Sequence, residues 1–189
     1  MTRMVNAADK LAEASRRNRS LLCIGLDPDL ARMPAAVRRS EDPLLTFNRA
    51  IIEATADLVC AFKPNLAFYE AHGLYGWQTL ERTVAAIPPG IPVILDAKRG
   101  DIGNTARMYA SALFEQLGGD GVTVNPYMGR EAVQPFLEHR DKITFLLAAT
   151  SNLGAGELQD VRDADGMPTY RKVARMAFEL DGKPGRAGL

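Results

Sequence analysis

The sequence has little of what disulfide-bonded and metal-binding proteins need. Its 189 residues include two cysteines and two histidines, which argues against a disulfide framework and against a cysteine–histidine metal site. Cys23 and Cys60 both lie within apolar runs, so we expect buried thiols in a protein of the reducing cytoplasm. We accordingly predict no bound metal.

Long apolar runs and an excess of charge of one sign are also absent. No run approaches the roughly 18 residues of a membrane span, and residues 1–20 are polar, unlike a secretion signal. The 23 basic residues balance the 23 acidic ones, which indicates neither nucleic acid nor an anionic membrane as a partner. We expect one folded domain over residues 1–189.

What the sequence does contain is an alternation of short apolar runs with amphipathic segments. Strands are predicted at residues 21–26, 58–62, 92–95, 121–124 and 143–149. Helices are predicted at residues 6–17, 46–56, 68–87, 104–117, 131–139 and 170–180, with Thr46 as an N-cap and interruptions at Gly73 and Gly76. This alternation predicts an α/β protein with a parallel sheet, either open or closed into a barrel.

Polar residues at the strand ends favour the barrel. A dinucleotide-binding sheet would carry a glycine-rich loop before its first helix, and this sequence has none there. A barrel gathers the residues that follow its strands at one rim, where its active site lies. The residues in such positions are Asp27, Lys63, Asn65, Asp96, Lys98, Asn125 and Ser151. We therefore predict a (β/α)8 TIM barrel.

The predicted barrel is incomplete. A whole barrel of this kind takes about 250 residues, whereas about five of its eight strand–helix units are recognisable here. An open piece of barrel would leave unpaired strand edges. We expect either a chain truncated at its C-terminus or a fold other than a closed barrel.

One charged segment is the strongest candidate for chemistry. Asp96 and Lys98 are two residues apart on a predicted strand, so their side chains should point to the same side. Gly100 permits a turn, after which Asp101 and Thr105 share one face of the next helix.

Two further charges, Asp27 and Lys63, end the preceding strands. Acids on both sides of Lys98 would keep its ammonium group charged and fixed. Because burying so many charges for stability alone is unfavourable, we interpret the cluster as functional rather than as structural ion pairing.

Several motifs together resemble those of the orotidine 5′-phosphate decarboxylase family, in particular its longer bacterial form. The motifs are Gly25-Leu26-Asp27-Pro28, Phe62-Lys63-Pro64-Asn65, Leu95 to Ala106, Val124-Asn125-Pro126-Tyr127 and Thr150-Ser151-Asn152. They follow the order of the family, and the similarity runs from about residue 6 to the end of the chain.

The resemblance implies cofactor-free decarboxylation of orotidine 5′-phosphate to uridine 5′-phosphate in pyrimidine biosynthesis. Lys98 would be the general acid that protonates C6 of the pyrimidine, and Asp96 would lie against the departing carboxylate. Lys63 and Asp27 would hold ribose hydroxyls. The decarboxylated ring has no group of its own to absorb the charge at C6, so a fixed cation at that place is what the reaction requires.

The resemblance also implies a homodimer with shared active sites. Asp101 and Thr105 would reach into the site of the neighbouring subunit, and Ser151 would contact the pyrimidine edge. Asn65 and Asn125 are less specific candidates for substrate binding. The phosphate-binding strand ends and lid of the family are not recognisable here, and residues 185–189 resemble the approach to the sixth strand. We therefore expect weak nucleotide binding, because remote phosphate contacts organise such reactions.

Three alternatives stay open. A related sugar-phosphate decarboxylase or aldolase would share the D-x-K-x-x-D pattern but use magnesium, although Lys63-Pro64-Asn65 and Thr150-Ser151-Asn152 argue against it. A Schiff-base aldolase would need a neutral Lys98, which flanking acids disfavour. A non-catalytic remnant is the third, because of the missing strands.

Overall fold

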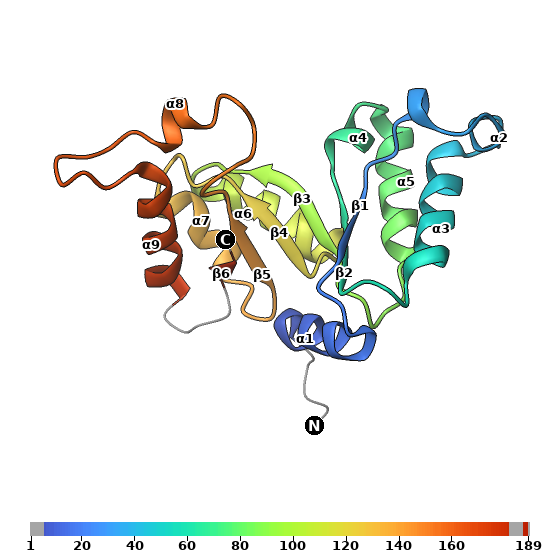
Figure 1. Ribbon diagram of the computed structural model, residues 1–189, viewed down its shortest axis with the longest axis horizontal. Coiled ribbons are helices and arrows are strands. Elements are labelled where there is room, and N and C mark those ends of the chain that lie inside the picture. Colours follow the sequence, from blue (N-terminus) through green and yellow to red (C-terminus); the bar gives the residue numbers. More distant parts are fainter. Residues whose placement is uncertain (1–5, 182–186, 189) are drawn as a thin grey trace.

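The strands lie side by side in the order of the sequence. The computed structural model describes residues 6–181 and 187–188 (Figure 1). β1 (Cys23–Leu26) pairs with β2 (Ala61–Pro64), and β3 (Ile94–Arg99) is followed by β4 (Gly121–Val124), β5 (Ile143–Leu146) and β6 (Ala187–Gly188). Every pair among these strands is parallel. The predicted α/β class with parallel strands is confirmed.

Isolated parallel bridges join the two sheets between β2 and β3, at Phe62 with Val93 and at Asn65 with Asp96. An open doubly wound sheet reverses its strand order at a switch point, whereas the order here runs from β1 to β6 without reversal. A β/α barrel has this consecutive order of parallel strands.

Helices connect the strands and cover their outer side (Figure 1). The longer ones are α1 (Ala7–Asn18), α3 (Pro43–Thr55), α5 (Gly73–Ala86), α6 (Gly103–Ser111), α7 (Arg130–Leu137) and α9 (Thr169–Asp181). Short pieces are the 3₁₀ turn Leu30–Arg32, α2 (Ala35–Arg38), α4 (Ala67–Glu70), the π-helical turn Ala112–Gln116 and α8 (Gly156–Gln159). Among the described residues, no helix has the length and hydropathy needed to cross a membrane.

The core lies between the strands and this helical layer. Phe62, Leu95, Val122 and Leu146 are completely or almost completely buried strand residues, and Phe136 of α7 packs in the same cluster. Burial of such side chains stabilises a fold by about 1.5–3 kcal/mol each. The core therefore fixes the strands whose ends carry the candidate site.

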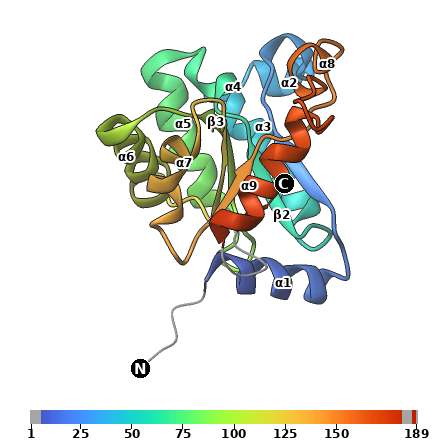
Figure 2. The same cartoon turned by 90° about the vertical axis from the view of Figure 1, so that its left-hand side faces the viewer.

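Helix α1 crosses the amino ends of the strands (Figure 2). Asn6 caps it by accepting the Asp9 N–H at 2.8 Å. The helix then reaches the segments before β5, β4, β3 and β2. Its contacts are Ala7 N–H to Asp141 O (2.7 Å), Lys10 with Asp120 (2.7 Å), Arg17 to Gly90 O (3.4 Å), and Asn18 to Ala56 O (3.0 Å) and Val59 O (2.7 Å).

Several predicted boundaries were wrong. The helix expected from Thr46 begins at Pro43, because Asp42 is its N-cap and accepts the Leu45 N–H at 3.2 Å. The second strand begins at Ala61 and not at Leu58, which is half exposed in the turn after α3.

Other differences concern single residues and short elements. The helix predicted over residues 68–87 is divided, since Gly73 has φ +59° and begins α5. Cys23 is exposed and not buried, whereas Cys60 is buried as expected. β6 is a sixth strand, which was not among the five predicted; Ala187 and Gly188 pair with Thr144 and Phe145.

Candidate active site

Asp96 lies at the centre of a charged cluster on β3. Its side chain accepts a hydrogen bond from Lys98 Nζ at 2.6 Å through Oδ1 and from Lys63 Nζ at 3.1 Å through Oδ2. The Thr123 hydroxyl also donates to Oδ1, at 2.8 Å. Asp96 is 8% exposed, so it is a buried carboxylate whose two oxygens are both occupied by donors.

Two opposing effects act on the pKa of Asp96. Burial raises the pKa, because it disfavours the charged carboxylate, but the hydrogen bonds from Lys98, Thr123 and Lys63 and the charge of Lys63 lower it. The hydrogen bonds prevail, and the pKa lies below its usual value of 3.8. Asp96 is therefore ionised at neutral pH and provides a fixed negative charge beside Lys98.

The backbone at Lys98 departs from a regular strand. The pairing of β3 with β4 is regular at Leu95 and shifts before Arg99, and Lys98 between them has φ +48°. This left-handed conformation costs an L-residue about 1–2 kcal/mol. The two side chains meet as expected. The expected reason, a regular strand from Asp96 to Lys98, was wrong. The Lys98 ammonium meets Asp96 across an irregular stretch within β3.

Two other predicted residues, Asp27 and Asn65, are linked at the ends of β1 and β2. Asp27 Oδ1 accepts the Asn65 N–H at 3.3 Å. Asp27 also borders a hollow of about 310 Å³ together with Gly25, Asp29 and Arg32. Asn65 pairs with Asp96 across the parallel bridge, so the hollow and the charged cluster adjoin one another.

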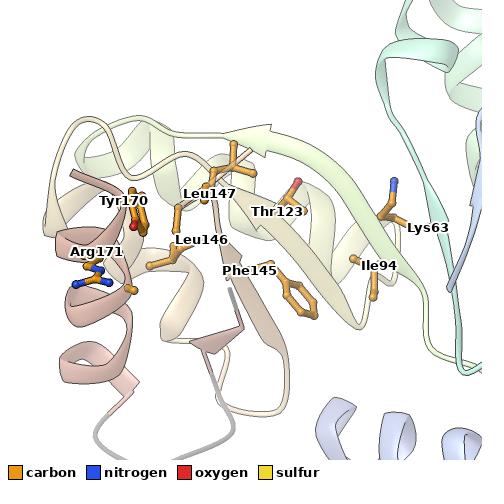
Figure 3. Close-up of a pocket in the computed structure, with 11 residues that line it drawn as sticks. Lys63, Ile94, Thr123, Phe145, Leu146, Leu147, Tyr170 and Arg171 are labelled. Carbon is orange, nitrogen blue, oxygen red and sulfur yellow. The ribbon is translucent and has the colours of Figure 1, made fainter. Parts of the chain in front are cut away.

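A larger pocket, of about 550 Å³, opens on the other side of Lys63. Lys63 and Thr123 contribute polar ends that point to the same side in Figure 3, while Ile94 and Phe145 are apolar. The remaining lining comes from the end of β5 and from α9: Leu146, Leu147, Ala148, Ala149, Tyr170, Arg171 and Ala174. A pocket with apolar walls and a few polar groups at one side suits a heterocyclic small molecule.

Asp101 and Thr105 lie apart from this cluster. The Asp101 carboxylate accepts the N–H of Ile102 at 2.8 Å, and Thr105 is exposed on α6. Within residues 6–181, no hydrogen bond or ion pair connects either of them to Asp96 or Lys98. Asp101 is thus half-buried and Thr105 exposed, and neither belongs to the Asp96 cluster of its own chain.

Asn125 and Ser151 follow β4 and β5. Asn125 Oδ1 accepts the Tyr127 N–H at 3.0 Å, and its backbone carbonyl closely approaches Gly100. Ser151 is exposed. The preceding Thr150 is held by Gln159, whose amide accepts its N–H at 2.9 Å and donates to its hydroxyl at 2.7 Å. Both predicted side chains thus stand at the rim but outside the Asp96 cluster.

Comparison with known proteins agrees with this geometry. Residues 20–184 match the orotidine 5′-phosphate decarboxylase / HUMPS family. The chain belongs to this family. It is 52% identical over 185 residues to an orotidine 5′-phosphate decarboxylase of Roseiflexus castenholzii, an alignment covering 98% of this chain and 68% of the relative. A second such enzyme, from Herpetosiphon aurantiacus, is 55% identical over 180 residues, with 95% and 67% covered.

Solved structures of decarboxylases from this family have the same arrangement of elements. A Leishmania donovani OMP decarboxylase superimposes with a TM-score of 0.85 at 39% identity, covering 97% of this chain and 69% of that one. A Toxoplasma gondii structure, described as a putative orotidine-monophosphate decarboxylase, gives 0.88 at 43% identity, covering 95% and 62%. The chain spans about two thirds of the length of these decarboxylases.

Thr123 is the member of the cluster that sequence reasoning missed. It stands in the apolar run Gly121–Val124, where a β-branched threonine is an ordinary strand residue. Its half-buried position between buried Val122 and Val124 is visible only in the structure, so the sequence offered no signal for it. Among the described residues, no group of three or more His, Cys, Asp or Glu side chains is placed to hold a metal ion.

Proposed function

We propose that this chain decarboxylates orotidine 5′-phosphate to uridine 5′-phosphate, with Lys98 as the general acid. The observation that carries the proposal is the ion pair of Lys98 with Asp96, 2.6 Å apart at the end of a parallel strand. Membership in the family and identities above 50% to curated decarboxylases support the reaction.

The chemistry assigns a task to each charge. Loss of carbon dioxide leaves an electron pair at C6 of the pyrimidine, and the Lys98 ammonium stabilises this charge and donates a proton to C6. The resulting amine regains its proton from solvent. Asp96, ionised because its hydrogen bonds keep its pKa low, orients the ammonium group before the reaction.

We further propose binding roles for the surrounding rim. Lys63 and Asp27 would hold ribose hydroxyls, which is consistent with their places beside the two hollows. Ser151, Asn65 and Asn125 would contact the base or hold the loops at the rim in place. All three residues follow the ends of strands. No cofactor takes part in this scheme.

The strand order supports a fuller architecture. We propose that residues 1–189 belong to one (β/α)8 barrel domain, because consecutive parallel pairing from β1 to β6 is the pattern of such a barrel. We place the enzyme in the cytoplasm, where pyrimidine nucleotides are made and free cysteines stay reduced.

The assembly that we propose is a homodimer with shared active sites. Thr105 is exposed beside exposed Ile102 and Met108 on one surface next to the site. A second copy covering this surface would bring Asp101 and Thr105 toward its own Lys98. The exposed apolar side chains support burial against another protein surface.

The test is the substitution Lys98→Ala, with Lys142→Ala as a control at a lysine outside the cluster. Decarboxylation is followed by the loss of orotidine 5′-phosphate absorbance, both in this chain and in a version extended by the remaining third of a relative. We expect the rate to fall by about 10³-fold or more in Lys98→Ala and to be unchanged in Lys142→Ala. Activity of Lys98→Ala within about tenfold of its parent contradicts the role of Lys98.

A magnesium-dependent sugar-phosphate reaction is the second candidate, because the matching family includes HUMPS members. The curated relatives at 52% and 55% identity are named decarboxylases, which favours the first proposal. Activity that a chelator abolishes and magnesium restores would favour the second.

A further inference from the structure

The hydroxyl of Thr123 contacts two parts of the charged cluster at once. It accepts the backbone N–H of Lys98 at 3.0 Å and donates its own hydrogen to Asp96 Oδ1 at 2.8 Å. The same carboxylate oxygen accepts the Lys98 ammonium at 2.6 Å. Thr123, Asp96 and Lys98 therefore form a closed ring of hydrogen bonds between β3 and β4.

The irregular pairing of β3 explains why this hydroxyl is needed. The register between β3 and β4 shifts before Arg99, where regular pairing with Val124 resumes. The Lys98 N–H bonds within that shift to a side chain of β4, where a regular ladder would offer a carbonyl. Thr123 thus stands in for a backbone acceptor at the one residue of β3 that has a positive φ.

The left-handed conformation of Lys98 explains why the Thr123 hydroxyl matters as an acceptor. A lysine prefers an extended backbone in a strand, and it remains in the left-handed region only where its surroundings hold it there. Because φ sets the direction in which the side chain leaves the backbone, a change of φ at Lys98 would move its ammonium group relative to Asp96. A hydroxyl that bonds both the Lys98 backbone and the Asp96 carboxylate holds the two ends of the pair together.

We propose that Thr123 is a positioning residue. It holds the strained Lys98 backbone so that Asp96 can orient the Lys98 ammonium group for proton donation to C6 of the substrate. This inference rests on the decarboxylase function proposed above. Of the two hydrogen bonds, one needs an acceptor and the other a donor, and a hydroxyl supplies both. Serine can replace threonine here, whereas valine, of the same shape, cannot.

The experiment compares Thr123→Val with Thr123→Ser. Amide hydrogen exchange at Lys98 is followed by NMR, with the Leu147 amide, which bonds to Val124 O at 3.0 Å, as a control for general loosening of β4. We expect exchange at Lys98 to be about tenfold faster in Thr123→Val, since one hydrogen bond is lost, and near the parent rate in Thr123→Ser. Exchange at Leu147 should stay unchanged in both.

The kinetic readout separates positioning from binding. We expect kcat to fall about tenfold or more in Thr123→Val while KM stays within about twofold, and Thr123→Ser to restore kcat. Equal exchange at Lys98 in Thr123→Val and the parent overturns the inference, as does an unchanged kcat in an active parent. If the valine variant does not fold, Thr123→Ala is read by the same criteria.

Failure of the proposed decarboxylase function and failure of the Thr123 role give different results. If the parent shows no decarboxylation in either length, the function fails, but exchange at Lys98 still decides whether the Thr123 hydroxyl holds that backbone. If the parent is active and the Lys98 amide is indifferent to Thr123, the function stands and the positioning role falls.

Discussion

Asp96 receives hydrogen bonds from side chains of three consecutive strands: Lys63 of β2, Lys98 of β3 itself and Thr123 of β4. A carboxylate buried to this degree would be unfavourable without such partners. Because the partners come from different strands, the ionised state of Asp96 depends on correct assembly of all three. The charge and the fold are therefore linked at this residue.

This linkage predicts how stability responds to acid. The pKa of Asp96 is lower in the folded protein than in the unfolded chain, so its contribution is present above the unfolded pKa of about 3.8 and is lost as pH falls through the folded pKa. We expect the parent to lose more stability than Asp96→Asn between about pH 5 and about pH 2. Urea unfolding at each pH measures the difference, and parallel pH profiles would contradict it.

Gly100 allows a close approach of backbone between the turns after β3 and β4. A Cβ atom at this position would lie 2.4 Å from the Asn125 carbonyl oxygen. We expect Gly100→Ala to destabilise the fold by about 1–3 kcal/mol, since backbone must move. Gly154→Ala is the control, because its Cβ would meet the flexible Glu157 side chain at 3.4 Å. Equal unfolding midpoints for the two variants would contradict this reason.

Residue identity alone predicted part of the cluster. Asp96, Lys98 and Lys63 were recognisable because they end apolar runs that read as neighbouring strands, and gathering such charges for stability alone is unfavourable. Thr123 was not recognisable, since its role depends on a shift in strand register and on the positive φ of Lys98, neither of which a sequence pattern encodes. The roles of Asp101, Thr105 and Ser151 remain predictions.

At the scale of elements, the helices and strands were predicted correctly in kind but not always in extent. β4 has the predicted bounds, because glycines and a proline limit that apolar run. The start of α3 was misplaced because both Asp42 and Thr46 can cap a helix. Pro43 favours the earlier start, since proline suits the first helical position. The short helices α2, α4 and α8 have too few residues for periodicity to show.

Helix α1 is predicted to stabilise the fold through its C-terminal residue. Asn18 donates to two backbone carbonyls, of Ala56 and Val59, that precede β2. We expect Asn18→Ala to lower the free energy of unfolding by about 1–2 kcal/mol. Arg16→Ala removes only an exposed pair with Glu13 on the same helix and should change it by less than about 0.5 kcal/mol. Chemical denaturation of both variants tests the contrast; a loss in Arg16→Ala as large as that in Asn18→Ala refutes it.

At the scale of the whole molecule, the proposed dimer makes its own prediction. Met108 on α6 is 66% exposed, beside Thr105. We expect Met108→Glu to convert a dimer into monomers, because a carboxylate would be desolvated in the interface. Sedimentation velocity gives the mass of each species.

Leu74 provides the matched control for this change. It is 75% exposed and belongs to α5, not to α6. Leu74→Glu should therefore sediment like the parent. A parent that stays monomeric at all concentrations tested, or a Met108→Glu protein that stays dimeric, is inconsistent with the shared-site arrangement.

The contacts of α1 also set an order in time. Its residues reach partners 41, 73 and 110 positions further along the chain, through Asn18, Arg17 and Lys10 respectively. A ribosome makes the chain from its amino end, so this helix leaves the exit tunnel before the strands that it contacts and finds its partners one after another as each strand emerges. Helix α1 is thus synthesised before its partners but is fully docked only after the last of them has emerged.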